Sequence, residues 1–111
     1  MASFKLSRRA EADLLHIGAY TLDRWGEEQA VRYLAELEAC CQRLADLPLL
    51  GRACNHIRPG LRCMEQGRHI VFYRPASEYV FISRILHQSM LPDKHSFKEV
   101  AGTIKRKRSL R

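Results

Sequence analysis

Residues 59–87, PGLRCMEQGRHIVFYRPASEYVFISRILH, decide the fold. The stretch is dense in Val, Ile, Phe and Tyr, the side chains that pack well on a pleated, half-buried surface. It predicts three consecutive strands over residues 62–65, 69–74 and 79–87, with the turn Pro75-Ala76-Ser77-Glu78 between the last two. Because Pro75 has no N–H for a strand ladder, we place it in the turn rather than in a strand.

The side chains of these strands divide between two faces, because successive residues of a strand point in opposite directions. On this alternation, one face carries mainly apolar residues and one arginine, namely Ile70, Phe72, Val80, Ile82, Arg84 and Leu86. The other face combines apolar bodies with polar tips, namely His69, Val71, Tyr73, Tyr79, Phe81, Ser83, Ile85 and His87. We expect more chain or a partner to cover this second face.

Two helices are predicted upstream of the three strands. Residues 3–6 alternate like a first strand, and Ser7 suits the N-cap of a helix that ends before Gly26. A second helix begins at Glu27 and ends before Pro48. Each helix has an apolar stripe at helical spacing: Ala10, Leu14, Ile17 and Thr21 in the first, and Ala30, Tyr33, Leu34, Leu37, Cys41, Leu44 and Leu47 in the second. The short link between them predicts an antiparallel hairpin.

The expected fold is therefore α+β, in the order β-α-α-β-β-β. The antiparallel helical hairpin packs on one face of a small, mainly antiparallel sheet, which buries both apolar surfaces. Residues 48–60 contain two prolines and two glycines and are expected to form a long loop. Asp93 suits the N-cap of a short C-terminal helix that runs to Val100. We expect a single domain over residues 1–104 and a basic tail over residues 105–111.

Composition excludes several classes of protein. The 111 residues, 46% apolar and 28% charged, are typical of one globular domain. No apolar run approaches the roughly 20 residues that a membrane span needs. The N-terminus is charged and amphipathic, unlike a secretory signal, so the expected compartment is the cytoplasm.

The four cysteines do not follow the spacing of a metal site or a redox motif. Cys40 and Cys41 are neighbours, and no C-x-x-C occurs. A ligand set of Cys54, His56 and Cys63 matches no common zinc pattern. We therefore expect reduced cysteines, no metal and no cofactor.

The net charge of +7 is distributed unevenly. Residues 1–50 carry six basic and eight acidic side chains, whereas residues 51–104 carry eight basic and four acidic. The tail adds five more positive side chains, including Lys105, Arg106, Lys107 and Arg108. Two interpretations of this tail stay open: a direct contact with nucleic acid, or a solvated chain end.

Four strings, in order, resemble one protein family. They are AEADLLHIGAYTLDRWGEEQA (10–30), LADLPLLG (44–51), RPGLRCMEQGRHIVFYR (58–74) and ISRILHQSM (82–90). They resemble the ParE branch of the ParE/RelE toxin superfamily, from type II toxin–antitoxin (plasmid stabilisation) systems, over about residues 4–90. The resemblance implies a compact toxin that a ParD-like antitoxin neutralises.

The resemblance also implies a target. ParE-like members poison DNA gyrase, whereas RelE-like members cleave mRNA on the ribosome. The RelE pattern has a lysine cluster across the central strands, and here no lysine lies between Lys5 and Lys94. We therefore expect a gyrase inhibitor that acts by direct binding and is not an enzyme. The alternative is a ribosome-dependent mRNA endonuclease of the RelE type.

Each alternative has its own candidate residues. An RNase needs a base, an acid and cations, and the candidates are Arg62, Arg68, His69, Tyr73, Arg84 and His87. For contacts with antitoxin or target, we expect Arg8, Arg9, Trp25, Arg58, Arg62, Arg68, Tyr73 and Arg84. Forked guanidinium groups suit pairing with an acidic partner.

Three of these residues have competing interpretations. His69 and His87 are either an acid/base couple or two partly buried histidines that are hydrogen-bonded within the sheet. Trp25 is either an exposed recognition anchor or a residue that packs the end of the hairpin.

Overall fold

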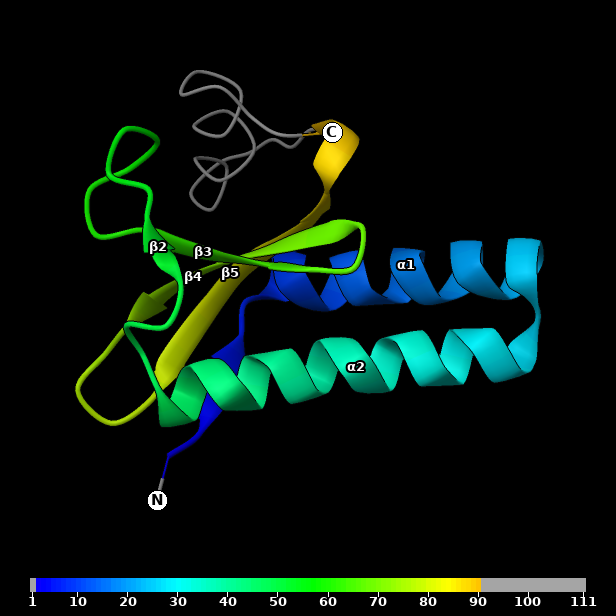
Figure 1. Cartoon of the computed structure of the whole chain (residues 1–111), viewed down its shortest axis with the longest axis horizontal. Helices are drawn as coiled ribbons and strands as arrows, with labels where there is room; N and C mark the ends of the chain where they lie inside the picture. Colours follow the sequence, from blue (N-terminus) through cyan, green and yellow to red (C-terminus); the bar gives the residue numbers. More distant parts are fainter. Residues whose placement is uncertain (1, 91–111) are drawn as a thin grey trace.

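The computed structural model describes residues 2–90 (Figure 1). The chain forms two layers, a helical hairpin on one face of a five-stranded sheet, which confirms the predicted α+β fold. The elements are β1 (Phe4–Leu6), α1 (Arg8–Trp25), α2 (Glu27–Asp46), β2 (Arg52–Ala53), β3 (Arg62–Gln66), β4 (His69–Pro75), β5 (Val80–His87) and the 3-10 turn η1 (Gln88–Met90). The helix expected after Asp93 and the basic tail lie outside the described residues.

The helical hairpin begins and turns where the sequence predicts. The Ser7 hydroxyl accepts a hydrogen bond from the Ala10 N–H at 2.9 Å and so caps α1. Gly26 alone links the helices, at a φ of 94° that favours glycine. Figure 1 shows α1 and α2 running antiparallel, with the linked end projecting beyond the sheet.

The strands lie in the order β1-β5-β4-β3-β2. Only β1 pairs in parallel, with β5, and the other pairs are antiparallel. Two predictions of local structure are wrong. The expected loop 48–60 contains the short strand β2, which pairs with β3. Pro75, expected in the turn, is instead the last residue of β4, where it lies opposite Val80. The strand tolerates a proline there because the N–H of the next residue, Ala76, makes the bond to the Tyr79 carbonyl at 2.8 Å.

A β-bulge changes which side chains share a face. Phe72 pairs with Arg84, but the next residue, Tyr73, pairs with Ile82, so Ser83 is an extra residue in β5. Side chains before and after Ser83 therefore alternate out of phase. The prediction that Val80 and Ile82 share a face with Ile70 and Phe72 is wrong for this reason.

The sheet has one apolar cluster on each face. The main core lies between the hairpin and the sheet and comprises Ala10, Ile17, Leu37, Cys40, Cys41, Leu44, Val71, Tyr73, Val80, Ile82 and Ile85. A smaller cluster, on the other face, comprises Cys54, Leu61, Cys63, Ile70, Phe72 and Leu86, with Ile57 packed against it. Each fully buried leucine of the hairpin stabilises the fold by about 1.5–3 kcal/mol.

Among the described residues, no helix has the length and apolarity needed to cross a membrane.

Candidate functional site: an apolar groove beside an edge strand

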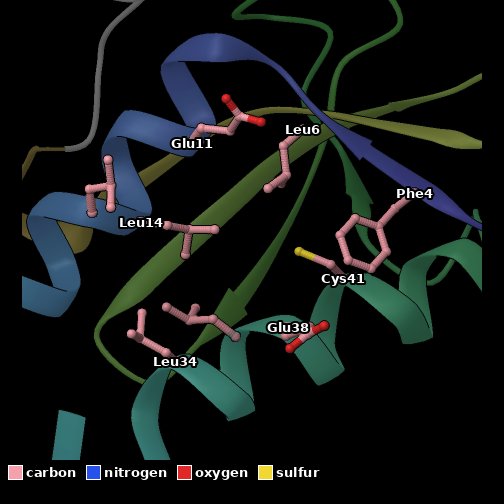
Figure 2. A pocket seen from close by; sticks show the side chains of 9 residues that line it. Phe4, Leu6, Glu11, Leu14, Leu34, Glu38 and Cys41 are labelled. Atoms are coloured by element: carbon pink, nitrogen blue, oxygen red, sulfur yellow. The ribbon is translucent and has the colours of Figure 1, made fainter. Parts of the chain in front are cut away.

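An apolar groove of about 550 Å³ opens between α1, α2 and β1. Its lining comprises Phe4, Leu6, Glu11, Leu14, Leu15, Leu34, Leu37, Glu38 and Cys41. Figure 2 shows side chains from the strand and both helices converging on one space, with the carboxylates of Glu11 and Glu38 at its sides. Leu15, which lines the groove, is 75% exposed, so its apolar side chain is available to a partner.

The groove adjoins an open edge of the sheet. Within residues 2–90, β1 pairs only with β5, so its other edge offers backbone groups to a partner. An apolar groove accepts the apolar face of a helix, and an open edge accepts an added strand. The site is therefore suited to a peptide segment rather than to a small polar substrate.

Polar contacts to the edge of β5 hold α1 in place and so shape the groove. Beyond β1, the Ser7 N–H donates to the Ile82 carbonyl at 3.0 Å, and the Ser7 hydroxyl donates to the Ser83 carbonyl at 2.7 Å. Nearly two turns further along, Asp13 accepts from the Ile85 N–H at 2.9 Å. The first two turns of α1 thus lie against the part of β5 that β1 leaves unpaired.

Arg84 is buried in this contact and does not face a partner. Its guanidinium makes two bonds of 2.9 Å to the Asp13 carboxylate, and only 5% of the residue is exposed. The expectation of Arg84 as a recognition or catalytic residue is therefore at odds with the structure. Asp13 was missed because it lies 71 residues away in sequence, on the first helix.

Tyr73 and Arg62 also have structural partners. Tyr73 is fully buried, and its hydroxyl donates to the Pro48 carbonyl at 2.8 Å and accepts from the Gly51 N–H at 2.9 Å. Arg62 donates to the carbonyls of Gly51 at 2.5 Å and Leu49 at 3.2 Å. The side chains of Tyr73 and Arg62 both anchor the loop after α2. Tyr73 is therefore not part of a binding surface, and the Arg62 guanidinium is hydrogen-bonded to this loop.

His69 and His87 lie side by side, as the predicted hairpin of β4 and β5 requires, with ring centroids 5.3 Å apart. The hydroxyl of Tyr33 lies 2.6 Å from Nδ1 of His69. Burial, with a smaller contribution from the neighbouring His87 and against the opposing effect of Asp13, lowers the pKa of His69 to about 4. His87 lies 2.8 Å from the hydroxyl of Ser89. At neutral pH, His69 is thus an uncharged, hydrogen-bonded part of the sheet.

The remaining predicted binding residues lie on separate elements. Arg8 at the start of α1, Arg58 before β3 and Arg68 in the β3–β4 turn are exposed, and Arg9 is half-buried. Trp25, at the far end of the hairpin, is 67% exposed, so it does not pack the hairpin end. Residues 2–90 contain no cluster of three or more His, Cys, Asp or Glu side chains that could hold a metal ion. Lys105, Arg106, Lys107 and Arg108 lie outside the described residues.

Comparison with known proteins gives a consistent result. A sequence model of the family described as "ParE toxin of type II toxin-antitoxin system, parDE" matches residues 4–92. Toxin ParE1 of Caulobacter vibrioides is 46% identical over 90 residues, which cover 81% of this chain and 93% of that protein. Toxin ParE1 of Mycobacterium tuberculosis is 44% identical over 93 residues, covering 83% of this chain and 95% of that protein.

Solved structures have the same fold. A chain of the chromosomal ParDE toxin–antitoxin system of Pseudomonas aeruginosa superposes with a TM-score of 0.67 at 25% identity, covering 78% of this chain and 96% of the other. A chain of the RelBE2 toxin–antitoxin complex of Mycobacterium tuberculosis gives a TM-score of 0.57 at 20% identity, with the same coverage.

Proposed function

The chain belongs to the ParE toxin family of type II toxin–antitoxin systems, and from that membership we propose that it inhibits DNA gyrase by direct binding. On this proposal the protein acts in the cytoplasm, carries out no catalytic step and is neutralised by a ParD-like antitoxin. The resemblance noted from the sequence motifs supports gyrase as the target. The structure supports binding rather than chemistry.

The disposition of the six RNase candidates carries the argument against catalysis. Tyr73 and Arg84 are buried, and the Arg62 guanidinium is held by backbone carbonyls. His69 is neutral and bonded to Tyr33, so it is unsuited to protonating a leaving group at neutral pH. Of the six candidates, only exposed Arg68 and half-buried His87 remain. Two groups are too few to supply a base, an acid and a phosphate-binding cation.

The projecting end of the hairpin is the best-suited surface for the target. Leu22 and Trp25 in the last turn of α1 are 52% and 67% exposed, and Val31 near the start of α2 is 63% exposed. Exposed apolar and aromatic side chains on a protruding element are typical of protein-binding surfaces, where tryptophan is enriched among the few residues that carry most of the binding energy.

The groove is the best-suited surface for the antitoxin. It is apolar, borders an open strand edge and exposes Leu15. An amphipathic antitoxin segment bound there would cover Leu15 and pack on Leu14 and Leu34. The groove and the hairpin end are different surfaces, so binding of antitoxin and target can be disrupted separately.

Supercoiling by purified gyrase tests the target. The full chain is expected to abolish supercoiling and to accumulate cleaved DNA, and Trp25→Ala is expected to weaken this inhibition tenfold or more. Leu49→Ala is the matched control, because Leu49 is 72% exposed but lies on the loop after α2. Intact supercoiling together with mRNA cut on stalled ribosomes would favour the RelE-type alternative instead.

Neutralisation by a ParD-like antitoxin tests the groove. Leu15→Glu places a charge where an apolar helix face should pack, so the variant should stay inhibitory when antitoxin is added. Leu49→Glu adds the same charge outside the groove and should be neutralised normally. Equal neutralisation of both variants would move the antitoxin site elsewhere.

A further inference from the structure

Two buried cysteines of the smaller apolar cluster are in direct contact. Cys54 and Cys63 are 2% and 1% exposed, and their Sγ atoms lie 2.6 Å apart. This separation is shorter than the roughly 3.5–4.0 Å usual between non-bonded carbon atoms and approaches the about 2.05 Å of a disulfide. All four cysteines of the chain are free thiols in this structure.

The strand pairing brings these two thiols together. Arg52 pairs with Cys63 across β2 and β3, and the Cys54 N–H donates to the Leu61 carbonyl at 2.8 Å. Cys54 and Cys63 are therefore diagonal neighbours on one face of a short hairpin. The contact results from the backbone hydrogen bonds on both sides of it, so the closed hairpin holds the two sulfurs next to each other.

We propose that Cys54 and Cys63 are a site of reversible disulfide formation, which closes residues 54–63 into a covalent loop. The proposal is independent of the gyrase and antitoxin proposals, because neither thiol lines the groove or lies on the hairpin end. Cys40 and Cys41, which are adjacent to each other in the sequence, lie elsewhere: both are on α2, in the main core.

A low-molecular-weight disulfide such as oxidised glutathione supplies the oxidising equivalents. One protein thiolate attacks a sulfur of the glutathione disulfide and releases one glutathione thiolate. The second protein thiolate attacks the protein sulfur of this mixed disulfide and releases the second. The two thiol protons pass to the two glutathione thiolates, so one disulfide is formed, one is reduced, and atoms and electrons balance.

Burial makes this reaction slow in the closed hairpin. Desolvation, together with a smaller effect of the neighbouring Cys54, raises the pKa of the Cys63 thiol to about 12. The attacking thiolate is therefore scarce while the hairpin is closed. Oxidation is expected to proceed when β2, which is only two residues long, separates from β3.

Once formed, the disulfide would restrain the segment between the two cysteines. That segment turns through bonds from the Ile57 N–H to the Cys54 carbonyl at 3.0 Å and from the Gly60 N–H to the Asn55 side chain at 2.8 Å. It carries the exposed Arg58. Hydrogen exchange of residues 54–62 should slow in the oxidised form, while exchange in α2 stays unchanged.

Peptide mapping tests the proposal on the full chain. The reduced protein is incubated with oxidised glutathione, remaining thiols are alkylated in acid, and the protein is digested with trypsin. Because Arg58 precedes proline, trypsin yields ACNHIRPGLR (53–62) and CMEQGR (63–68), while Cys40 and Cys41 stay together in YLAELEACCQR (33–43).

The expected product is the first two peptides joined, with the loss of two hydrogen atoms and with 33–43 fully alkylated. Cys54→Ser should leave 63–68 alkylated or glutathionylated but never joined to another peptide. Cys40→Ser is the matched control and should still give the joined pair. The proposal would be overturned if peptides 53–62 and 63–68 were found alkylated in the folded protein and also in urea just below the unfolding transition. A link from either peptide to residues 33–43 would overturn it as well.

Discussion

The Asp13–Arg84 pair is the residue contact on which the packing of α1 most depends. Asp13 accepts two bonds from the guanidinium and one from the Ile85 N–H. Both charged side chains are nearly buried, with 11% and 6% exposed. A buried pair of this kind is costly to break, because the partner left behind keeps its charge in an apolar setting.

Asp13→Ala is therefore expected to lower the free energy of unfolding by about 3–5 kcal/mol, measured by urea denaturation. Adding Arg84→Met removes the stranded charge, so the double variant should be more stable than Asp13→Ala alone. A double variant as unstable as the sum of both single changes would contradict this account.

His69 makes stability depend on pH in a definite direction. Its pKa is about 4 in the folded chain, against 6.5 for an ordinary histidine. The unfolded chain therefore binds a proton more readily, and the stability due to neutral His69 is present above pH 6.5 and is lost as pH falls towards 4. The Tyr33 hydroxyl, 2.6 Å from Nδ1, is hydrogen-bonded to the ring in this neutral form.

We expect the free energy of unfolding to fall by roughly 1–2 kcal/mol between pH 7 and pH 4.5 on account of His69. This change in free energy is smaller than the full shift of the His69 pKa from 6.5 to about 4 would give, because water partly screens the half-buried ring. Urea midpoints across this range should show a shallower slope for His69→Gln than for the parent chain. Equal slopes would assign the pH dependence to other groups.

At the scale of elements, the loop between α2 and β2 is held by one buried hydroxyl and one arginine. Tyr73 bonds to Pro48 and Gly51, and Arg62 bonds to Leu49 and Gly51. Gly51 must be glycine for steric reasons, since an added Cβ would lie 2.5 Å from the Cys63 carbonyl oxygen. The loop is thus fixed against the sheet by contacts from β3 and β4.

Tyr73→Phe removes the hydroxyl and leaves the Gly51 N–H and the Pro48 carbonyl without this partner. We expect a loss of about 1–3 kcal/mol in the free energy of unfolding, together with faster hydrogen exchange at Gly51. Exchange in α1 should be unchanged, because α1 makes no contact with this hydroxyl in the hydrogen bonds of the described residues.

The elements were largely predictable and their side-chain partners were not. Ser7, Gly26 and Pro48 mark helix ends by local chemistry, which a sequence displays directly. The bulge at Ser83 leaves no local signal, because an extra residue in a strand looks like any other until the partner strand is known. Arg84 illustrates the same limit for the site: its partner Asp13 is defined only by the tertiary fold.

At the scale of the whole molecule, the excess of positive charge and the apolar groove lie in different halves of the chain. Residues 1–50 carry a net acidic balance, whereas residues 51–90 carry six arginines and two glutamates. The apolar groove lies between α1, α2 and β1, in the acidic half. A partner that covers the groove and also reaches the sheet arginines would therefore be held both by burial of apolar surface and by attraction to positive charge.

Titrating an acidic, amphipathic antitoxin against the chain at increasing salt should separate the two contributions. Affinity is expected to fall as salt rises, because screening weakens the contacts to exposed arginines. The loss of affinity caused by Leu15→Ala, which changes no charge, should persist at high salt, because burial of apolar surface is not screened. An affinity that does not respond to salt would remove the charge contribution.

The position of β1 has a consequence for synthesis on the ribosome. The first strand to be made pairs only with β5, the last strand to be made among the described residues, and α1 is held by Ser83, Arg84 and Ile85 of that strand. While the nascent chain lacks residues 80–87, the helical hairpin has no completed sheet on which to bury its leucines. The growing polypeptide therefore exposes its apolar stripe until residues 80–87 have emerged and paired. An antitoxin already present could engage the groove at the moment when the sheet closes, before a free toxin molecule exists.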